Sequence, residues 1–131
     1  MALFANDKAG KFILRVALGG ILLLHGIGKL KSGVDWMAGP LSAHGLPAFL
    51  AYGAYVGEVL APLMLIAGFY ARIGAALVSI HMLFALFLVH QGEIFKLNET
   101  GSWAIEFQAL LLFSAIAVML IGPGKPGINE K

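Results

Sequence analysis

Ionisable side chains are rare in this sequence, and several of them stand inside long apolar stretches. Such groups cost about 2.5–3.5 kcal/mol each in hydrocarbon, so they usually face a protein interior or water. The residues that place an imidazole, a carboxylate or an ammonium group in an apolar setting are His25, Lys29, Glu58, His81, His90 and Glu106. We expect them to face one another and to form a cofactor-binding site.

Three kinds of chemistry suit such a cluster: metal binding, proton transfer and the binding of a quinone head group. A quinone needs a hydrogen-bond donor at each carbonyl and an ionisable partner that moves protons. Either His25 with Glu106 or His81 with Glu58 meets that need. A metal is less favoured because the sequence has no Glu-x-x-His pair. Bis-histidine haem is less favoured because His25 and His81 differ by about 6 Å in estimated depth.

The same residues also fit a purely structural role. Buried His–Glu and Lys–Glu pairs can fix the register of packed helices without binding anything. We predict a quinone as the cofactor and no metal site, and the sequence assigns no residue a catalytic role.

The composition places the apolar stretches in a membrane. Of 131 residues, 60% are hydrophobic and 12% are charged, and the mean hydropathy is +0.88. A water-soluble fold of this size cannot bury so much apolar side chain. The net charge of +2 comes from scattered cations, which argues against nucleic acid as a partner. The absence of cysteine excludes disulfides and thiolate chemistry.

A hydrocarbon core of ~30 Å takes about 20 helical residues to cross. We therefore predict an all-α fold, a polytopic membrane four-helix bundle in one domain, with spans at approximately 12–30, 48–69, 71–90 and 102–121. If the N-terminus is placed in the cytoplasm, more cations lie on the cytoplasmic side than on the outer side. Both termini are therefore predicted to be cytoplasmic. The first outer loop carries a predicted short amphipathic segment with Val34, Trp36, Met37 and Leu41.

Estimated depths divide the polar residues into two levels. Glu58 and His81 lie near the midplane, roughly 15 Å above the inner boundary. The outer level, at roughly 21–28 Å, holds the remaining four, His25, Lys29, His90 and Glu106.

Two arginines are predicted near the inner boundary. Arg15 lies roughly 6 Å above it and is expected to extend its long side chain to the inner surface. Arg72 is expected to anchor the hairpin between the second and third spans on the inner side.

The order of the motifs resembles that of DoxX family membrane proteins. The resemblance rests on Leu14–Gly19, His25–Lys29, Gly45–Pro47, Gly57–Gly68, Arg72, His90, Glu106 and Gly122–Lys125. The tail departs from the family pattern, with Asn129-Glu130 where an aspartate is expected. The family takes its name from subunits of archaeal quinone-linked sulfur-oxidising and terminal oxidase complexes. The resemblance therefore implies a four-helix inner-membrane protein with a redox or quinone role.

Three functional hypotheses follow. The first is a redox-associated subunit of a quinone-linked oxidoreductase in the bacterial cytoplasmic (inner) membrane, served by a redox partner protein. The second is a non-enzymatic scaffold or assembly factor. The third is a small transporter or proton path with Glu58 as the carrier group. The expected partners are the lipid bilayer and, because small-residue faces remain after packing, a second copy of the chain.

Overall fold

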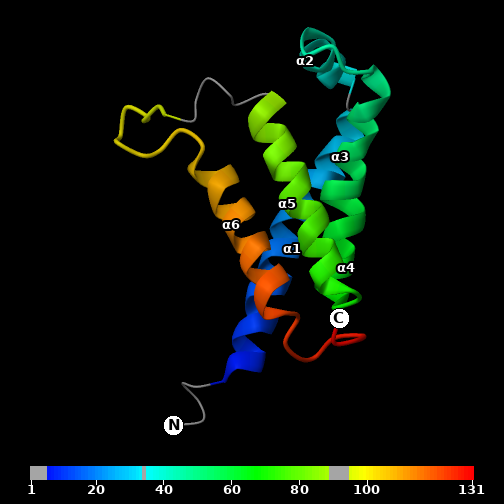
Figure 1. Cartoon of the computed structure of the whole chain (residues 1–131), viewed down its shortest axis with the longest axis vertical. Helices are drawn as coiled ribbons and strands as arrows, with labels where there is room; N and C mark the ends of the chain where they lie inside the picture. The colour runs from blue at the N-terminus through cyan, green and yellow to red at the C-terminus, as the bar shows by residue number, and fades with distance from the viewer. Residues whose placement is uncertain (1–5, 34, 89–94) are drawn as a thin grey trace.

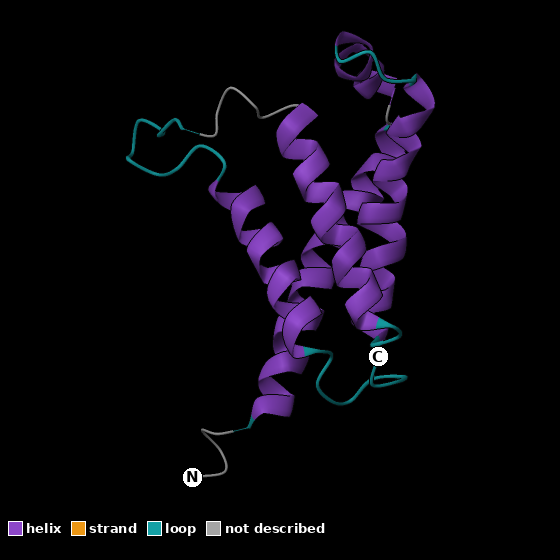
Figure 2. Cartoon of the chain, viewed as in Figure 1, coloured by secondary structure: helices purple, strands orange, loops and turns teal. Residues whose placement is uncertain are grey.

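The computed structural model describes residues 6–33, 35–88 and 95–131, and most of these residues are helical (Figure 2). The elements in chain order are α1 (Asp7–Ser32), η1 (Asp35–Met37), α2 (Ala38–Ala43), η2 (Ala48–Tyr52), α3 (Gly53–Tyr55), η3 (Val56–Leu60), α4 (Ala61–Ala67), α5 (Ala71–Leu88) and α6 (Glu106–Ile121). The four elements from η2 to α4 form one continuous helical stretch, residues 48–67. The fold is thus all-α, as predicted.

The helix ends follow local signals. α1 begins earlier than the predicted apolar stretch because the Asn6 side chain accepts a hydrogen bond of 3.0 Å from the backbone N–H of Ala9. Gly68 ends α4 in the left-handed region, with φ at +67°. α5 is described as far as Leu88, so the predicted end of the third span lies outside the described residues.

α6 begins four residues later than the apolar stretch that predicts it. The backbone N–H of Ala104 donates to the Lys96 carbonyl at 3.0 Å, and that of Asn98 donates to the Ser102 carbonyl at 2.6 Å. These bonds hold the chain in a loop that turns back on itself. The Ser102 carbonyl, which a helix over residues 102–105 would pair with the Glu106 N–H, is therefore already engaged.

The long helices lie side by side (Figure 1). α1 packs on α4 and α6, and α5 packs on the same two helices. The core between them is built from small and aliphatic side chains, among them Leu18, Leu22, Ala61, Leu65, Ala75, Val78, Ala115 and Val118. The start of α1 and the C-terminal residues 122–131 lie at the same end of the molecule, opposite α2 (Figure 1).

Two helical stretches have the length and hydropathy of a membrane span. They are α1 and residues 48–67, each with a mean hydropathy of 1.6. Residues 71–87 of α5 and all of α6 are apolar but shorter.

The predicted amphipathic segment is helical and folds over one end of the helices. Met37 and Leu41 are buried against Ala51 and Ala54, in a second core cluster. Trp36 remains 55% exposed, and Val34 lies outside the described residues. The segment therefore forms a roof (residues 35–43) over the η2 end of the second helical stretch.

Arg15 does not extend to the surface, so that expectation is wrong. Its side chain is fully buried. Nη1 donates to the carbonyls of Leu65 and Ile66 at 2.6 and 3.0 Å, Nε donates to the Pro123 carbonyl at 2.9 Å, and Nη2 donates to the Pro126 carbonyl. The last carbonyls of α4 lack helical partners. Arg15 donates to two of these carbonyls, those of Leu65 and Ile66, and ties the C-terminal tail (residues 122–131) to α4.

The tail is also held at its far end. Asn129 donates its backbone N–H to the Gly68 carbonyl at 3.1 Å and accepts a 3.0 Å bond from the Tyr70 N–H at its side-chain oxygen. The expected anchor residue Arg72 donates to the Met119 carbonyl of α6 at 3.3 Å. Both arginines thus lie at helix C-termini, where a cation complements the helix dipole.

Arg15→Lys should destabilise the protein although it keeps the positive charge. An ammonium group has three donors and cannot match the fork geometry that reaches four carbonyls. Each buried acceptor left without a partner costs about 1–3 kcal/mol. We expect a lower thermal midpoint for the protein in mild detergent and faster proteolysis of the C-terminal tail. Lys31→Arg, an exposed position on the same helix, is the control, and equal midpoints for the two variants would contradict the role given to Arg15.

Candidate functional site

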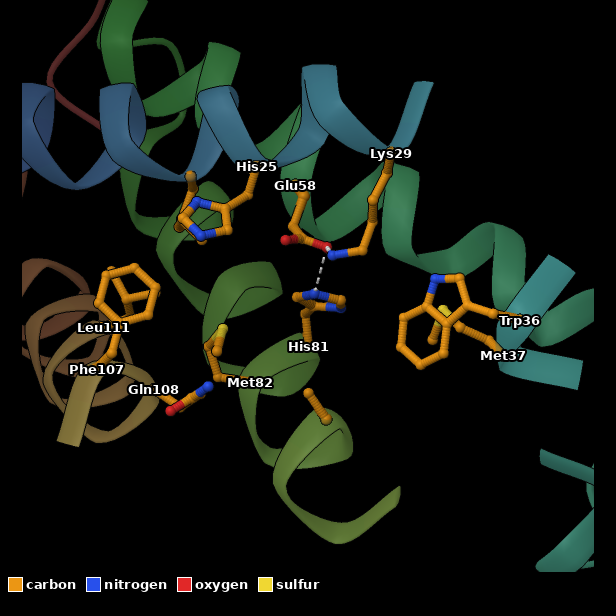
Figure 3. A pocket seen from close by; sticks show the side chains of 12 residues that line it. His25, Lys29, Trp36, Met37, Glu58, His81, Met82, Phe107, Gln108 and Leu111 are labelled. Carbon is orange, nitrogen blue, oxygen red and sulfur yellow. Dashed lines mark hydrogen bonds and ion pairs between the residues drawn. The ribbon is translucent and has the colours of Figure 1, made fainter. Parts of the chain in front are cut away.

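Three of the predicted residues meet at one carboxylate oxygen. Glu58 Oε2 accepts a hydrogen bond from Lys29 Nζ and another from His81 Nε2, the latter at 3.1 Å. The Glu58 side chain is 6% exposed, that of His81 13% and that of Lys29 24%. Figure 3 shows the three groups pointing toward one another from α1, η3 and α5. We call them the Lys29–Glu58–His81 triad.

Glu58 lies in a π-helical turn that the sequence produces through a proline. Pro62 stands four residues after Glu58 and has no N–H to donate to the Glu58 carbonyl, and its ring would clash with that carbonyl in a regular α-helix. The chain adopts i→i+5 bonding instead, with the Ala61 N–H donating to the Val56 carbonyl. Such π turns occur often at functional sites.

Two glycines allow the helices to approach closely around Glu58. A Cβ on Gly26 would lie 1.9 Å from the Glu58 carbonyl oxygen, and one on Gly57 would lie 2.4 Å from Cγ of His81. Neither position has room for a side chain. The backbone of α1 therefore lies directly on η3, and the His81 ring lies directly on the η3 backbone.

A cavity of 190 Å³ opens beside the triad. Its walls combine the triad with His25 and Gln108 and with aromatic and aliphatic side chains, namely Leu22, Trp36, Met37, Met82, Ala85, Phe107 and Leu111. Figure 3 shows His25 and Phe107 on one side and Trp36 and Met37 of the roof on the other. The site thus lies between α1, η3, α5 and α6 beneath the roof.

His25 belongs to the cavity but not to the triad. Its ring stacks on Phe107, with centroids 5.2 Å apart and an interplanar angle of 28°. Nδ1 lies 3.0 Å from the Ile21 carbonyl oxygen and must donate to it, because a carbonyl only accepts. A neutral His25 therefore presents Nε2 as a proton acceptor.

Lys29 does not stay at the outer level that its backbone depth predicts. Helical side chains lean toward the N-terminus of their own helix, and the long Lys29 chain covers the distance back to Glu58. The two predicted levels are thereby joined.

Glu106 is not among the residues that the structure brings together. Glu106 is the first residue of α6 and is exposed, whereas Gln108 is half-buried and lines the cavity. His90 lies outside the described residues. The amide of Gln108 thus occupies the place on α6 that the sequence assigns to a carboxylate.

A second hollow adjoins the first on the other side of His81. This apolar groove of 330 Å³ shares only His81 and Met37 with the cavity. The groove is otherwise lined by η2, α3, η3 and α5, through Leu50, Gly53, Ala54, Val56, Gly57, Leu77, Ile80 and Phe84. The same imidazole therefore touches both spaces.

Sequence reasoning predicted the amphipathic segment but not its place over the cavity, and it overlooked the aromatic walls. A tryptophan or phenylalanine near the end of an apolar stretch is typical of interfacial anchoring, and nothing in the spacing separates Trp36 or Phe107 from that role. Gln108 was the available signal, as a polar side chain inside an apolar run. Within the described ranges, no group of three or more His, Asp or Glu side chains is arranged to hold a metal ion.

Gly26→Ala should destabilise the protein, because the new methyl group meets the Glu58 carbonyl. Overpacking of this kind costs about 1–3 kcal/mol, and more where backbone is displaced. Gly28→Ala, on the same helix with nothing within 4 Å of the new Cβ, should leave the thermal midpoint unchanged or raise it. The comparison is made by thermal unfolding in detergent, and a harmless Gly26→Ala would refute the close contact.

Comparison with known proteins places the chain in a family. The DoxX family model matches residues 10–91, more than half of the chain. The chain is 34% identical over 115 residues to a Bacillus subtilis protein named "Putative oxidoreductase CatD", covering 88% of this chain and 81% of that protein. It is 30% identical over 122 residues to an uncharacterized Haemophilus influenzae protein, covering 90% and 87%. No solved structure matches.

Proposed function

The chain belongs to the DoxX family, and we propose that it is a multi-span inner-membrane protein that binds a quinone head group beside the Lys29–Glu58–His81 triad. In this proposal it serves as a redox-associated subunit. The observation that carries the proposal is the triad itself, a buried ion-pair network in the wall of a cavity large enough for one aromatic ring.

The outer surface supports a four-span membrane bundle. Large apolar side chains face outward along the helices, among them Leu24 at 71% exposure, Ile80 at 64%, Leu110 at 66% and Leu120 at 71%. A surface of this kind is unusual on a soluble monomer and suits lipid. Lys8, Lys11 and Lys125 lie together where the start of α1 contacts the C-terminal tail, which supports a cytoplasmic location of this end by the positive-inside rule. Both curated relatives are bacterial, in keeping with an inner-membrane location.

The cavity residues fit a quinone head group. An apolar cavity of about 150 Å³ holds a benzene ring, so 190 Å³ suits a single substituted ring. Phe107 and Leu111 offer apolar walls, while the Lys29 ammonium and the Gln108 amide offer hydrogen-bond donors. A prenyl tail does not fit in this volume, so it has to leave the cavity for the apolar surroundings of the helices.

The residues of the triad suit proton handling. Reduction of a quinone to a quinol takes up two electrons and two protons. Lys29 and His81 each hold a hydrogen next to the cavity, and Glu58 accepts from both and stabilises the positive charge of Lys29. His25 Nε2 is a further proton-accepting atom on the same wall. The electrons come from a redox partner protein, and the name of the Bacillus subtilis relative agrees with a redox role.

The purely structural alternative draws on the same triad. The triad joins α1, η3 and α5, and a network that only fixes helix register would do the same. A homodimer is compatible with either function.

Fluorescence tests the proposal, because the sequence has two tryptophans and one lines the cavity. In Trp103→Phe protein, short-chain ubiquinone should quench the fluorescence of Trp36 saturably, and Trp36→Phe should abolish the saturable signal. Lys29→Met should weaken binding about ten- to a hundredfold, since a hydrogen bond from a charged group contributes about 1.5–3 kcal/mol. Lys31→Met is the control on the same helix.

Gln108→Leu separates binding from folding, since Gln108 lies outside the triad. It should weaken quinone binding while the thermal midpoint stays close to that of the parent. If no variant with intact Trp36 shows saturable quenching and Lys29→Met lowers only the midpoint, the structural role is correct and the quinone proposal fails.

A further inference from the structure

Cationic side chains gather at the end of the molecule opposite the roof. Lys8 and Lys11 of α1, Arg72 of α5 and Lys125 of the tail line one pocket of 360 Å³. Its remaining lining comes from Ile121, Pro123, Gly124 and Glu130. Four cations and one carboxylate leave a formal charge of +3 around a single hollow.

The pocket is held in shape by backbone contacts. Gly124, with φ at +67°, lies on the first turns of α1, where a Cβ would come within 2.4 Å of the Lys8 carbonyl oxygen and 2.6 Å of the Lys11 Cβ. The Lys125 N–H donates to the Lys8 carbonyl at 3.4 Å, and Arg72 is fixed by its bond to the Met119 carbonyl. The cations therefore converge because the tail is folded against α1.

An anionic group already occupies this charge cluster. The carboxylate of Glu130 pairs with Lys125 Nζ at 3.0 Å. The Lys125 hydrogen bond lowers the pKa of the exposed Glu130, and the charge of Lys8 adds a smaller effect in the same direction. One carboxylate does not balance four cations, so the pocket retains a capacity for further negative charge.

We propose that this pocket binds the phosphate of an anionic phospholipid in the cytoplasmic leaflet. Arg72 offers a planar donor pair and the lysines offer point charges, a combination suited to phosphate. The apolar stretch of α1 starts directly after Lys11, and that of α6 ends at Ile121. The pocket thus lies where the hydrocarbon ends and the headgroups begin. Basic pockets at this depth are typical sites for anionic headgroups.

The test uses the full chain in neutral detergent, titrated with phosphatidylglycerol, with phosphatidylcholine and with inorganic phosphate. Native mass spectrometry reports bound lipid and thermal unfolding reports stabilisation. Phosphatidylglycerol should bind at least tenfold more tightly than phosphatidylcholine. Lys8→Gln with Lys11→Gln should reduce the phosphatidylglycerol affinity about tenfold or more. Lys31→Gln with Lys96→Gln removes the same charge at the opposite end and should have no such effect.

Glu130→Gln provides a test that cannot fail through misfolding, because Glu130 is exposed. Removal of the competing carboxylate should strengthen phosphatidylglycerol binding. Equal losses in the two double variants would overturn the proposal, as would unchanged affinity in Glu130→Gln. Competition by millimolar inorganic phosphate as strong as that by lipid would instead show a free-anion site and overturn the lipid assignment.

The proposal shares with the proposed function only the placement of the chain in a membrane. Recovery of the chain in washed membranes is therefore checked first. A chain found in the soluble fraction would contradict both proposals. A membrane-bound chain that fails to discriminate between headgroups would contradict the lipid site alone and leave the quinone measurements unaffected.

Discussion

A single buried carboxylate, that of Glu58, sets the arrangement of the helices around it. A carboxylate in an apolar interior is costly unless cations and hydrogen-bond donors surround it. Lys29 and His81 meet this requirement from two other helices. The bare backbone at Gly26 and Gly57 lets those helices come near enough. The close packing at the centre of the molecule and the polar wall of the cavity therefore have one electrostatic cause.

The opposite end of the molecule stabilises a buried charge in a different way. Arg15 faces backbone carbonyls from α4 and from the tail, and none of its bonds described here goes to a carboxylate. Peptide dipoles at a helix C-terminus carry partial negative charge and suit a guanidinium group. The tail is thus part of the fold, because its carbonyls complete the shell around Arg15. The tail also bonds the first turn of α1 and the end of α4, so loss of the tail would remove a contact that these two helices share.

Helical spacing predicted that Glu58 and His81 lie at one level, because the depth of each residue along its helix follows from the rise per residue. The same estimate misplaced Lys29, since it followed the backbone and ignored the length and direction of the side chain. Depth also says nothing about the direction in which a helix faces. This is why Glu106 was expected in the cluster, whereas Gln108, two residues later, lines the cavity. The buried state of Arg15 depends on a tail folding back, which no periodicity in the sequence reveals.

The π turn at residues 56–60 stands between two packing regions of one continuous helical stretch. Ala54, before the turn, packs under the roof, and Ala61, after it, packs in the main core. A π turn holds one residue more than an α-helical turn does, so the apolar pattern of the stretch does not have to keep one register from end to end. One continuous helical stretch can thus support the roof with its first half and the bundle with its second, and Glu58 stands between the two.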